Sequence, residues 1–229
     1  MFVGSFTVDA IKPLIETYVA SLPATHARET WRDLGIQPPA GVVEKTVQKG
    51  LAPKSAVAIV FSGPFEYDDA HRLALQALQL VLQSRLFDTI RQELGGTYSI
   101  ETDVDASKVP KPTYTVRIDW TCDPARTGML VQRVFDEVES VRRLSFSPRQ
   151  VTIIREALLR DYERNSQDNA YLLNQLAERY ANGDAADLAP VVNPTARIAA
   201  LTAESIQQAL QTYLNTGNYV RVTLVPEGR

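Results

Sequence analysis

Apolar and polar side chains alternate strictly through residues 114–122. One face carries Tyr114, Val116, Ile118, Trp120 and Cys122, and the other carries Thr115, Arg117, Asp119 and Thr121. A repeat of two residues is the period of a β-strand with one covered and one wetter face. The sequence therefore predicts a sheet that is packed mainly on one side. It also places Cys122 in the packed layer, where a free cysteine commonly lies.

Five other segments are predicted to be strands. Residues 43–49 and 98–104 also alternate, and residues 219–225 follow a turn that contains asparagine and glycine. The run 56–61 is continuously apolar, which predicts a strand that is buried on both faces. Residues 2–6 are predicted to be the end of a strand, which would need a neighbouring strand from its own protein.

Apolar residues at helical spacing predict several helices between these strands. Capping residues mark where most of them begin, and Ser147 and Gln150 form a capping box. The longest helix opens at Asp68 and Asp69 and runs to about Leu94. It is apolar nearly all round, so we expect a central element of the fold. The predicted helices span residues 8–21, 68–94, 124–141, 147–162, 168–180 and 202–214.

The order of these elements predicts an α+β fold. Adjacent strands and blocks of helices are typical of a two-layer sandwich with a mostly antiparallel sheet and helices packed on one face. We expect one domain over residues 1–229, in which an opening strand and helix (1–22) and a loop (23–40) precede the main body (41–229). Because the chain begins inside a predicted strand, we expect it to be part of a longer protein.

Composition excludes several classes of function. The chain has 24 basic and 27 acidic residues and a net charge of −3, without the basic stripe expected for a nucleic-acid or anionic-membrane partner. Its single cysteine excludes a disulfide framework and a cysteine-rich zinc site. No segment approaches the ~20 apolar residues that span a bilayer. We therefore predict no nucleic-acid partner and no membrane span.

The two histidines, His26 and His71, give little support for a metal site, because a catalytic zinc needs about three protein ligands. His26 begins a run that comes within one residue of the inverted zincin pattern His-x-x-Glu-His. The fifth position of this run is Thr30, and the segment lies in a proline-flanked loop. His71 has no partner at helical spacing and is predicted to be a surface or capping residue. We predict no metal site in this chain.

The end of the long helix carries the residues with the clearest chemical potential. Arg91 lies in the last helical turn, Gly95 and Gly96 form a turn, and Tyr98 heads the next strand. A guanidinium and a phenol brought together there could donate to a peptide carbonyl or to an oxyanion. A second interpretation stays open, in which Arg91 interacts with carbonyls at the helix end and Tyr98 is half-buried packing.

A family signature is recognisable in the same region. The run Arg-Leu-Phe at 85–87, with Arg-Gln-Glu-Leu-Gly-Gly-Thr-Tyr-Ser at 91–99, resembles the carboxy-terminal half of pitrilysin/insulinase-family zinc metallopeptidases. There a tyrosine follows an arginine by seven positions, as Tyr98 follows Arg91. Residues 3–23 and 147–158 resemble other elements of the family, so the resemblance covers nearly the whole chain. It implies a metallopeptidase-like half-domain.

The resemblance also implies roles for these residues. In that family the zinc lies in the amino-terminal half, on His-x-x-Glu-His and a distant glutamate, and the carboxy-terminal half closes over the substrate. Tyr98 would then be catalytic, donating to the developing oxyanion, and Arg91 would bind a substrate backbone carbonyl. Arg85 also matches a family position and is expected to be structural. Zinc is expected only in the missing half, so the 229 residues alone should be inactive.

The sequence therefore predicts the carboxy-terminal, substrate-enclosing domain of a zinc metalloendopeptidase. Its expected partners are a peptide or unfolded polypeptide substrate and an amino-terminal zinc-bearing half. An alternative is a non-catalytic binding or assembly subunit that pairs with a separate zinc-bearing peptidase, and a third is a degenerate scaffold without a proteolytic role. Similar bacterial proteins are often periplasmic, so we expect an exported parent protein.

Overall fold

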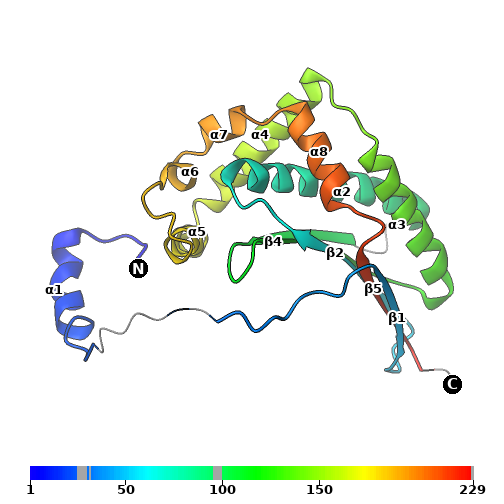
Figure 1. Cartoon of the computed structure of the whole chain (residues 1–229), viewed down its shortest axis with the longest axis horizontal. Coiled ribbons are helices and arrows are strands. Elements are labelled where there is room, and N and C mark those ends of the chain that lie inside the picture. Colours follow the sequence, from blue (N-terminus) through cyan, green and yellow to red (C-terminus); the bar gives the residue numbers. More distant parts are fainter. Residues whose placement is uncertain (25–29, 31, 95–99, 228–229) are drawn as a thin grey trace.

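A computed structural model describes residues 1–24, 30, 32–94 and 100–227, with only the backbone at 91–94. The main body has two layers, a five-stranded sheet and a group of helices over one face of it (Figure 1). The predicted α+β sandwich with helices on one face is confirmed. None of the described helices is both long and apolar enough to cross a bilayer.

The sheet is mostly antiparallel, with the strand order β1-β5-β2-β4-β3. β2 (Ser55–Pro64) pairs antiparallel with both β4 (Thr113–Cys122) and β5 (Tyr219–Val225). β4 also pairs antiparallel with β3 (Ile100–Ser107). β1 (Val42–Gln48) runs parallel to β5. The last strand in the sequence therefore lies between the first two.

The alternation along β4 produces the two faces that its sequence predicts. Its apolar set is buried under the helices, and Cys122 is fully buried there, as expected. β2 follows the same pattern, because Val57, Ile59 and Phe61 are buried whereas Ala56, Ala58 and Val60 are only partly buried. The prediction that residues 56–61 are buried on both faces is wrong. The reason is that no described helix covers the second face of the sheet.

Helix α2 (Asp69–Leu94) is the central element that its composition predicts. It packs on β3 and also contacts α3 (Thr127–Arg142) and α8 (Ala203–Tyr213). Burial of so much apolar surface on one helix supplies a large part of the hydrophobic driving force for folding. Its buried apolar residues are Leu73, Ala74, Leu75, Ala77, Leu78, Leu82, Leu86 and Ile90.

Four of the other helical segments, η1 (Pro124–Arg126), α4 (Pro148–Asn165), α5 (Asn169–Ala181) and α8, begin at capping residues that the sequence predicts. Asp123 caps the short η1, which leads into α3. Ser147 and Gln150 form the predicted capping box, and Asp168 and Thr202 cap their helices through side-chain oxygens. Caps satisfy backbone N–H groups that the first helical turn leaves unpaired. Two other helices are α6 (Ala189–Val192) and α7 (Thr195–Ala199).

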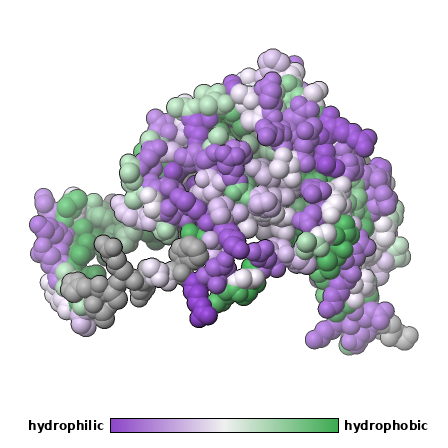
Figure 2. All heavy atoms as spheres, in the orientation of Figure 1, coloured by the Kyte–Doolittle hydropathy of each residue, from purple (hydrophilic) through white to green (hydrophobic). Residues whose placement is uncertain are grey.

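Helix α1 (Val8–Tyr18) lies apart from the main body (Figure 1). None of its residues is buried, and hydrophobic atoms lie on its surface, at the left of Figure 2. Residues 2–6 precede it and belong to no strand of the sheet, with Phe2 and Phe6 exposed. The prediction of a strand there is wrong for this structure, because a strand needs a hydrogen-bonded neighbour and none lies beside it in the described part of the chain.

Candidate functional site

The two residues singled out in the sequence flank the connection between α2 and β3. Arg91 lies in the last turn of α2, as predicted, and its side chain is outside the described residues. Tyr98 also lies outside the described residues, which resume at Ile100, the first residue of β3. The convergence of these two side chains therefore stays a prediction. What the structure does describe is how the two flanking elements are held.

A carboxylate on α3 holds the last turns of α2. Glu137 Oε1 accepts a hydrogen bond from Arg85 Nε at 2.7 Å, and its Oε2 accepts one from Thr89 Oγ1 at 3.2 Å. Arg85 and Thr89 lie one helical turn apart, so both face the same neighbour. Arg85, which was expected to be structural, thus binds Glu137, a partner that no local sequence pattern indicated.

Two glutamines of α2 hold the other flanking element, strand β3. Gln83 Nε2 donates to the carbonyl of Ile100 at 2.9 Å, and Gln79 Nε2 donates to the carbonyl of Thr102 at 2.7 Å. An unpaired carbonyl on an edge strand is a site at which another strand can add. These hydrogen bonds occupy two such carbonyls, so this end of β3 is fixed to α2.

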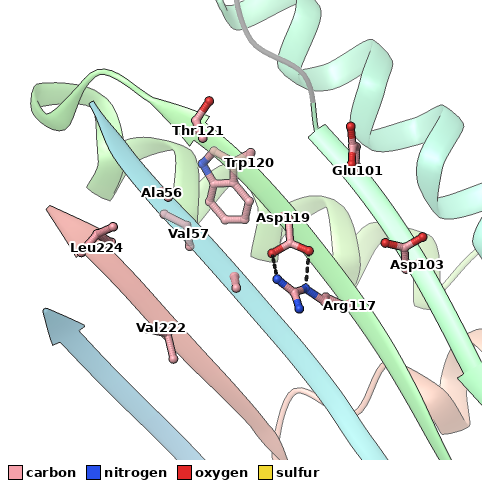
Figure 3. A pocket seen from close by; sticks show the side chains of 11 residues that line it. Ala56, Val57, Glu101, Asp103, Arg117, Asp119, Trp120, Thr121, Val222 and Leu224 are labelled. Atoms are coloured by element: carbon pink, nitrogen blue, oxygen red, sulfur yellow. Dashed lines mark hydrogen bonds and ion pairs between the residues drawn. The ribbon is translucent and has the colours of Figure 1, made fainter. Parts of the chain in front are cut away.

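The open face of the sheet is hollowed next to the beginning of β3. The hollow has a volume of about 620 Å³ and lies over β5, β2, β4 and β3 (Figure 3). Its floor is apolar over β2 and β5, where Ala56, Ala58, Val222 and Leu224 lie, and charged toward β3. The open face of the sheet thus has an apolar side and a charged side. Figure 2 shows hydrophobic atoms beside β1 and β5 at the lower right.

The charged side of the hollow has more acidic than basic groups. Arg117 donates to both oxygens of Asp119, with Nη2 at 2.8 Å from Oδ1, and these hydrogen bonds raise the pKa of the guanidinium. Neither Glu101 nor Asp103 is within ion-pair distance of a basic group among the described residues, although Asp103 is close enough for its charge to stabilise Arg117. The hollow thus favours cationic over anionic groups, while lacking a nucleophile paired with a base.

His71, one of the two histidines weighed for metal binding, lies at the start of α2 beside Asp68. Asp68 Oδ1 accepts from the backbone N–H of His71 at 2.7 Å, and both Asp68 oxygens lie 2.9 Å from His71 Nδ1. Burial raises the pKa of Asp68, but these hydrogen bonds outweigh it and lower the pKa overall. Among the described residues, only Glu66, Asp68 and His71 come close enough together to share a metal ion. The capping role predicted for this segment is confirmed at Asp68, and His26 lies outside the described residues.

Asp69 has a role that the sequence interpretation missed. Rather than capping α2, it forms ion pairs with Arg179 of α5 and with Arg197 of α7 at 3.5 Å. Burial lowers the pKa of Arg197, which the Asp69 charge partly offsets. Arg72, one turn along α2, binds Glu178 at 2.7 Å. We call Asp69, Arg72, Glu178, Arg179 and Arg197 the arginine cluster. It joins three helices that are distant in sequence, a kind of contact that no local pattern encodes.

Comparison with known proteins identifies a family. The family model described as "Peptidase M16 inactive domain" matches residues 1–158. No curated protein sequence is significantly similar to the chain.

Several solved structures share the fold at low sequence identity. The periplasmic protease PqqL from Escherichia coli has 18% identity and a TM-score of 0.76, over 98% of this chain and 25% of that one. A protease from Helicobacter pylori has 15% identity and a TM-score of 0.76, over 98% of this chain and 54% of that one. A peptidase M16 inactive domain from Pseudomonas fluorescens has 14% identity and a TM-score of 0.72, over 99% and 53%. The chain thus spans a quarter to about half of the length of these proteins.

Proposed function

The chain belongs to the peptidase M16 inactive-domain family, and from this premise we propose that it is the zinc-free, substrate-enclosing domain of a zinc metalloendopeptidase. The observation that carries the proposal is the family match combined with the position of Arg91 on α2. Arg91 stands in the last turn of a rigidly held helix, seven positions before Tyr98, in the pattern that the family resemblance requires.

The described residues do not fit a catalytic zinc. Their one candidate ligand group, Glu66, Asp68 and His71, is tied to helix capping, since Asp68 binds both the backbone N–H and the ring of His71. A catalytic zinc typically has three protein ligands and an open position for water. We therefore propose that the metal lies in a separate zinc-bearing half and that the carboxylates of this chain take no part in the hydrolysis.

The proposed contribution of this chain is electrostatic. Hydrolysis of a peptide bond places negative charge on the former carbonyl oxygen, and a preorganised donor stabilises that charge. Tyr98 would supply such a donor through its phenol. Arg91 would bind a neighbouring backbone carbonyl of the substrate and thereby hold the polypeptide in register. Both are donors to main-chain groups, so they would accept peptides of varied sequence.

Substitutions in the intact peptidase test the proposal. Tyr98→Phe should lower kcat by ~10²–10³-fold with a smaller change in KM, as for loss of one oxyanion donor. Arg91→Ala should lower kcat/KM. Matched controls are Tyr180→Phe and Arg160→Ala, because both side chains are exposed, and each should leave kcat/KM unchanged. Unchanged kinetics in both Tyr98→Phe and Arg91→Ala would instead favour a binding or assembly subunit without a catalytic contribution.

We also propose that the parent protein is exported. The similar PqqL is described as a periplasmic protease, which supports this compartment. Fractionation of cells that express the parent protein tests it, and recovery in the cytoplasm alone would contradict it.

A further inference from the structure

We propose that Glu137 is a positioning residue, which fixes the last turns of α2 against α3 and so sets where Arg91 meets the substrate. The inference rests on the proposed function, and it adds a residue that the family resemblance does not indicate. Glu137 lies in the middle of α3, on a different helix from Arg91 and 46 positions away in the sequence.

The contacts of Glu137 are suited to holding a helix end. Its side chain is only 12% exposed, and each of its oxygens binds a different residue of α2. Arg85 and Thr89 lie four positions apart, on one side of α2. Two attachment points along the axis restrain the helix against both rotation and unwinding, which a single contact could not do.

The place of these contacts along α2 matters as much as their number. Thr89 lies two residues before Arg91, and the buried Ile90 is the last residue of α2 whose side chain the structure describes. Helix ends fray, because the last four carbonyls have no partner within the helix. A carboxylate that binds the turn directly before Arg91 therefore limits fraying at the point where the position of Arg91 is set.

The same ion pair contributes little to overall stability. Arg85 is 47% exposed, and exposed partners gain little from ion pairing in water. The larger effect of removing Glu137 is thus expected locally, at the end of α2. A local effect at the end of α2 would indicate a positioning role, and a loss of overall stability would indicate a general structural role, so experiment can distinguish the two.

A double-mutant cycle in the intact peptidase tests the inference. Glu137→Ala should lower kcat/KM by about 3- to 10-fold, a coupling of the size seen between residues of one network. In an Arg91→Ala background the same substitution should cause no further loss, because Glu137 acts through Arg91. Glu137→Gln, whose amide oxygen can accept from Arg85 while its NH2 group donates to the Thr89 hydroxyl, should retain most of the activity. Additive losses in the double mutant would overturn the inference.

The same helix offers a matched control in Glu139. This carboxylate binds Arg142 and Thr216, each at 2.7 Å, and forms an ion pair with Arg143 at 3.8 Å, but none of these partners belongs to α2. Glu139→Ala should leave kcat/KM unchanged. An equal loss in Glu139→Ala and Glu137→Ala would show a general effect on α3 and would contradict the positioning role.

Hydrogen exchange gives a readout that does not depend on activity. In the 229-residue chain, Glu137→Ala should speed amide exchange at residues 89–94 by about 10-fold and leave residues 73–82 unchanged, because local opening is governed by local contacts. Unchanged exchange at 89–94 would overturn the inference. If Tyr98→Phe and Arg91→Ala both leave the kinetics of the peptidase unchanged, the proposed function fails, whereas a silent Glu137→Ala beside a damaging Arg91→Ala removes only this inference.

Discussion

Arg179 of α5 donates to the carboxylate of Asp69 in the first turn of α2, although 110 positions separate the two residues in the sequence. The Arg179 side chain is only 8% exposed, and Arg197 and Arg72 also approach the same carboxylate. A single aspartate therefore compensates the charge of a nearly buried arginine and joins α5 and α7 to the central helix.

Substitution of Asp69 should destabilise the protein strongly. Asp69→Asn leaves the positive charge of Arg179 without its carboxylate, and breaking such a buried pair typically costs about 3 kcal/mol. The measurement is the free energy of unfolding in urea. Glu16→Gln is the control, since it breaks only the exposed pair with Lys12 and should cost less than ~0.5 kcal/mol. Equal effects of the two substitutions would contradict this account of the arginine cluster.

Two glycines should respond to alanine in opposite ways. A Cβ at Gly63 would lie 3.0 Å from the ring of Tyr114, its cross-strand partner, which is buried against Tyr213. Gly63→Ala should therefore destabilise the protein by about 1–2 kcal/mol through overpacking. At Gly128, in the first turn of α3, a Cβ meets no atom within 4 Å. Gly128→Ala should stabilise by up to ~1 kcal/mol, and thermal unfolding of both variants measures the difference.

The thiol of Cys122 should be inert in the folded protein. It is fully buried and contacts Thr127 Oγ1 at 3.5 Å. A thiol reagent such as DTNB reaches a buried sulfur only when the protein opens. We expect one thiol to react at once in denaturant and almost none under native conditions. Rapid native labelling would show that the packed layer beside β4 is open.

The stability contributed by Glu139 should disappear in acid. The Thr216 hydroxyl and then Arg142 stabilise its ionised form and lower the pKa below the ordinary value of 4.5, against a smaller opposing effect of burial. The unfolded chain therefore takes up the proton first as pH falls, so this contribution is complete above pH 4.5 and is lost through the depressed pKa. Because the side chain is about a third exposed, the effect should stay below ~1 kcal/mol. Unfolding of Glu139→Gln and the unsubstituted protein between pH 3 and 7 should show a difference that shrinks toward the acid end.

Local sequence patterns predicted the elements better than their pairing. The alternation along 114–122 and the cap at Ser147 are encoded within a few residues, so both were recovered from the sequence. The continuous apolar run at 56–61 led to the wrong prediction of a strand buried on both faces, because side chains such as Ala56 and Ala58 are apolar whether or not a second layer covers them. The parallel pairing of β1 with β5 joins Val42 to Tyr219, and such distant partners leave no periodic signal.

For the candidate site, the structure tests only the helical position of Arg91, and the roles of Arg91 and Tyr98 stay predictions. The place of Arg91 near the end of a helix follows from local periodicity and is confirmed, whereas Tyr98 lies outside the described residues. Glu137 and the arginine cluster were missed, because they depend on which helices become neighbours in space. An acidic residue on a helix can have many different partners, and only the packing of the helices determines which residues it contacts.

The central position of β5 affects the order in which the molecule can be completed during synthesis. Among the described strands, β1 pairs with β5 alone. Until residues 219–225 have left the ribosome, β1 therefore has no strand to pair with. In that interval β2 has an unfilled edge on the side that β5 later occupies. The sheet can therefore close only after residues 219–225 have left the ribosome, and until then the open edges of β1 and β2 are available for pairing with other chains.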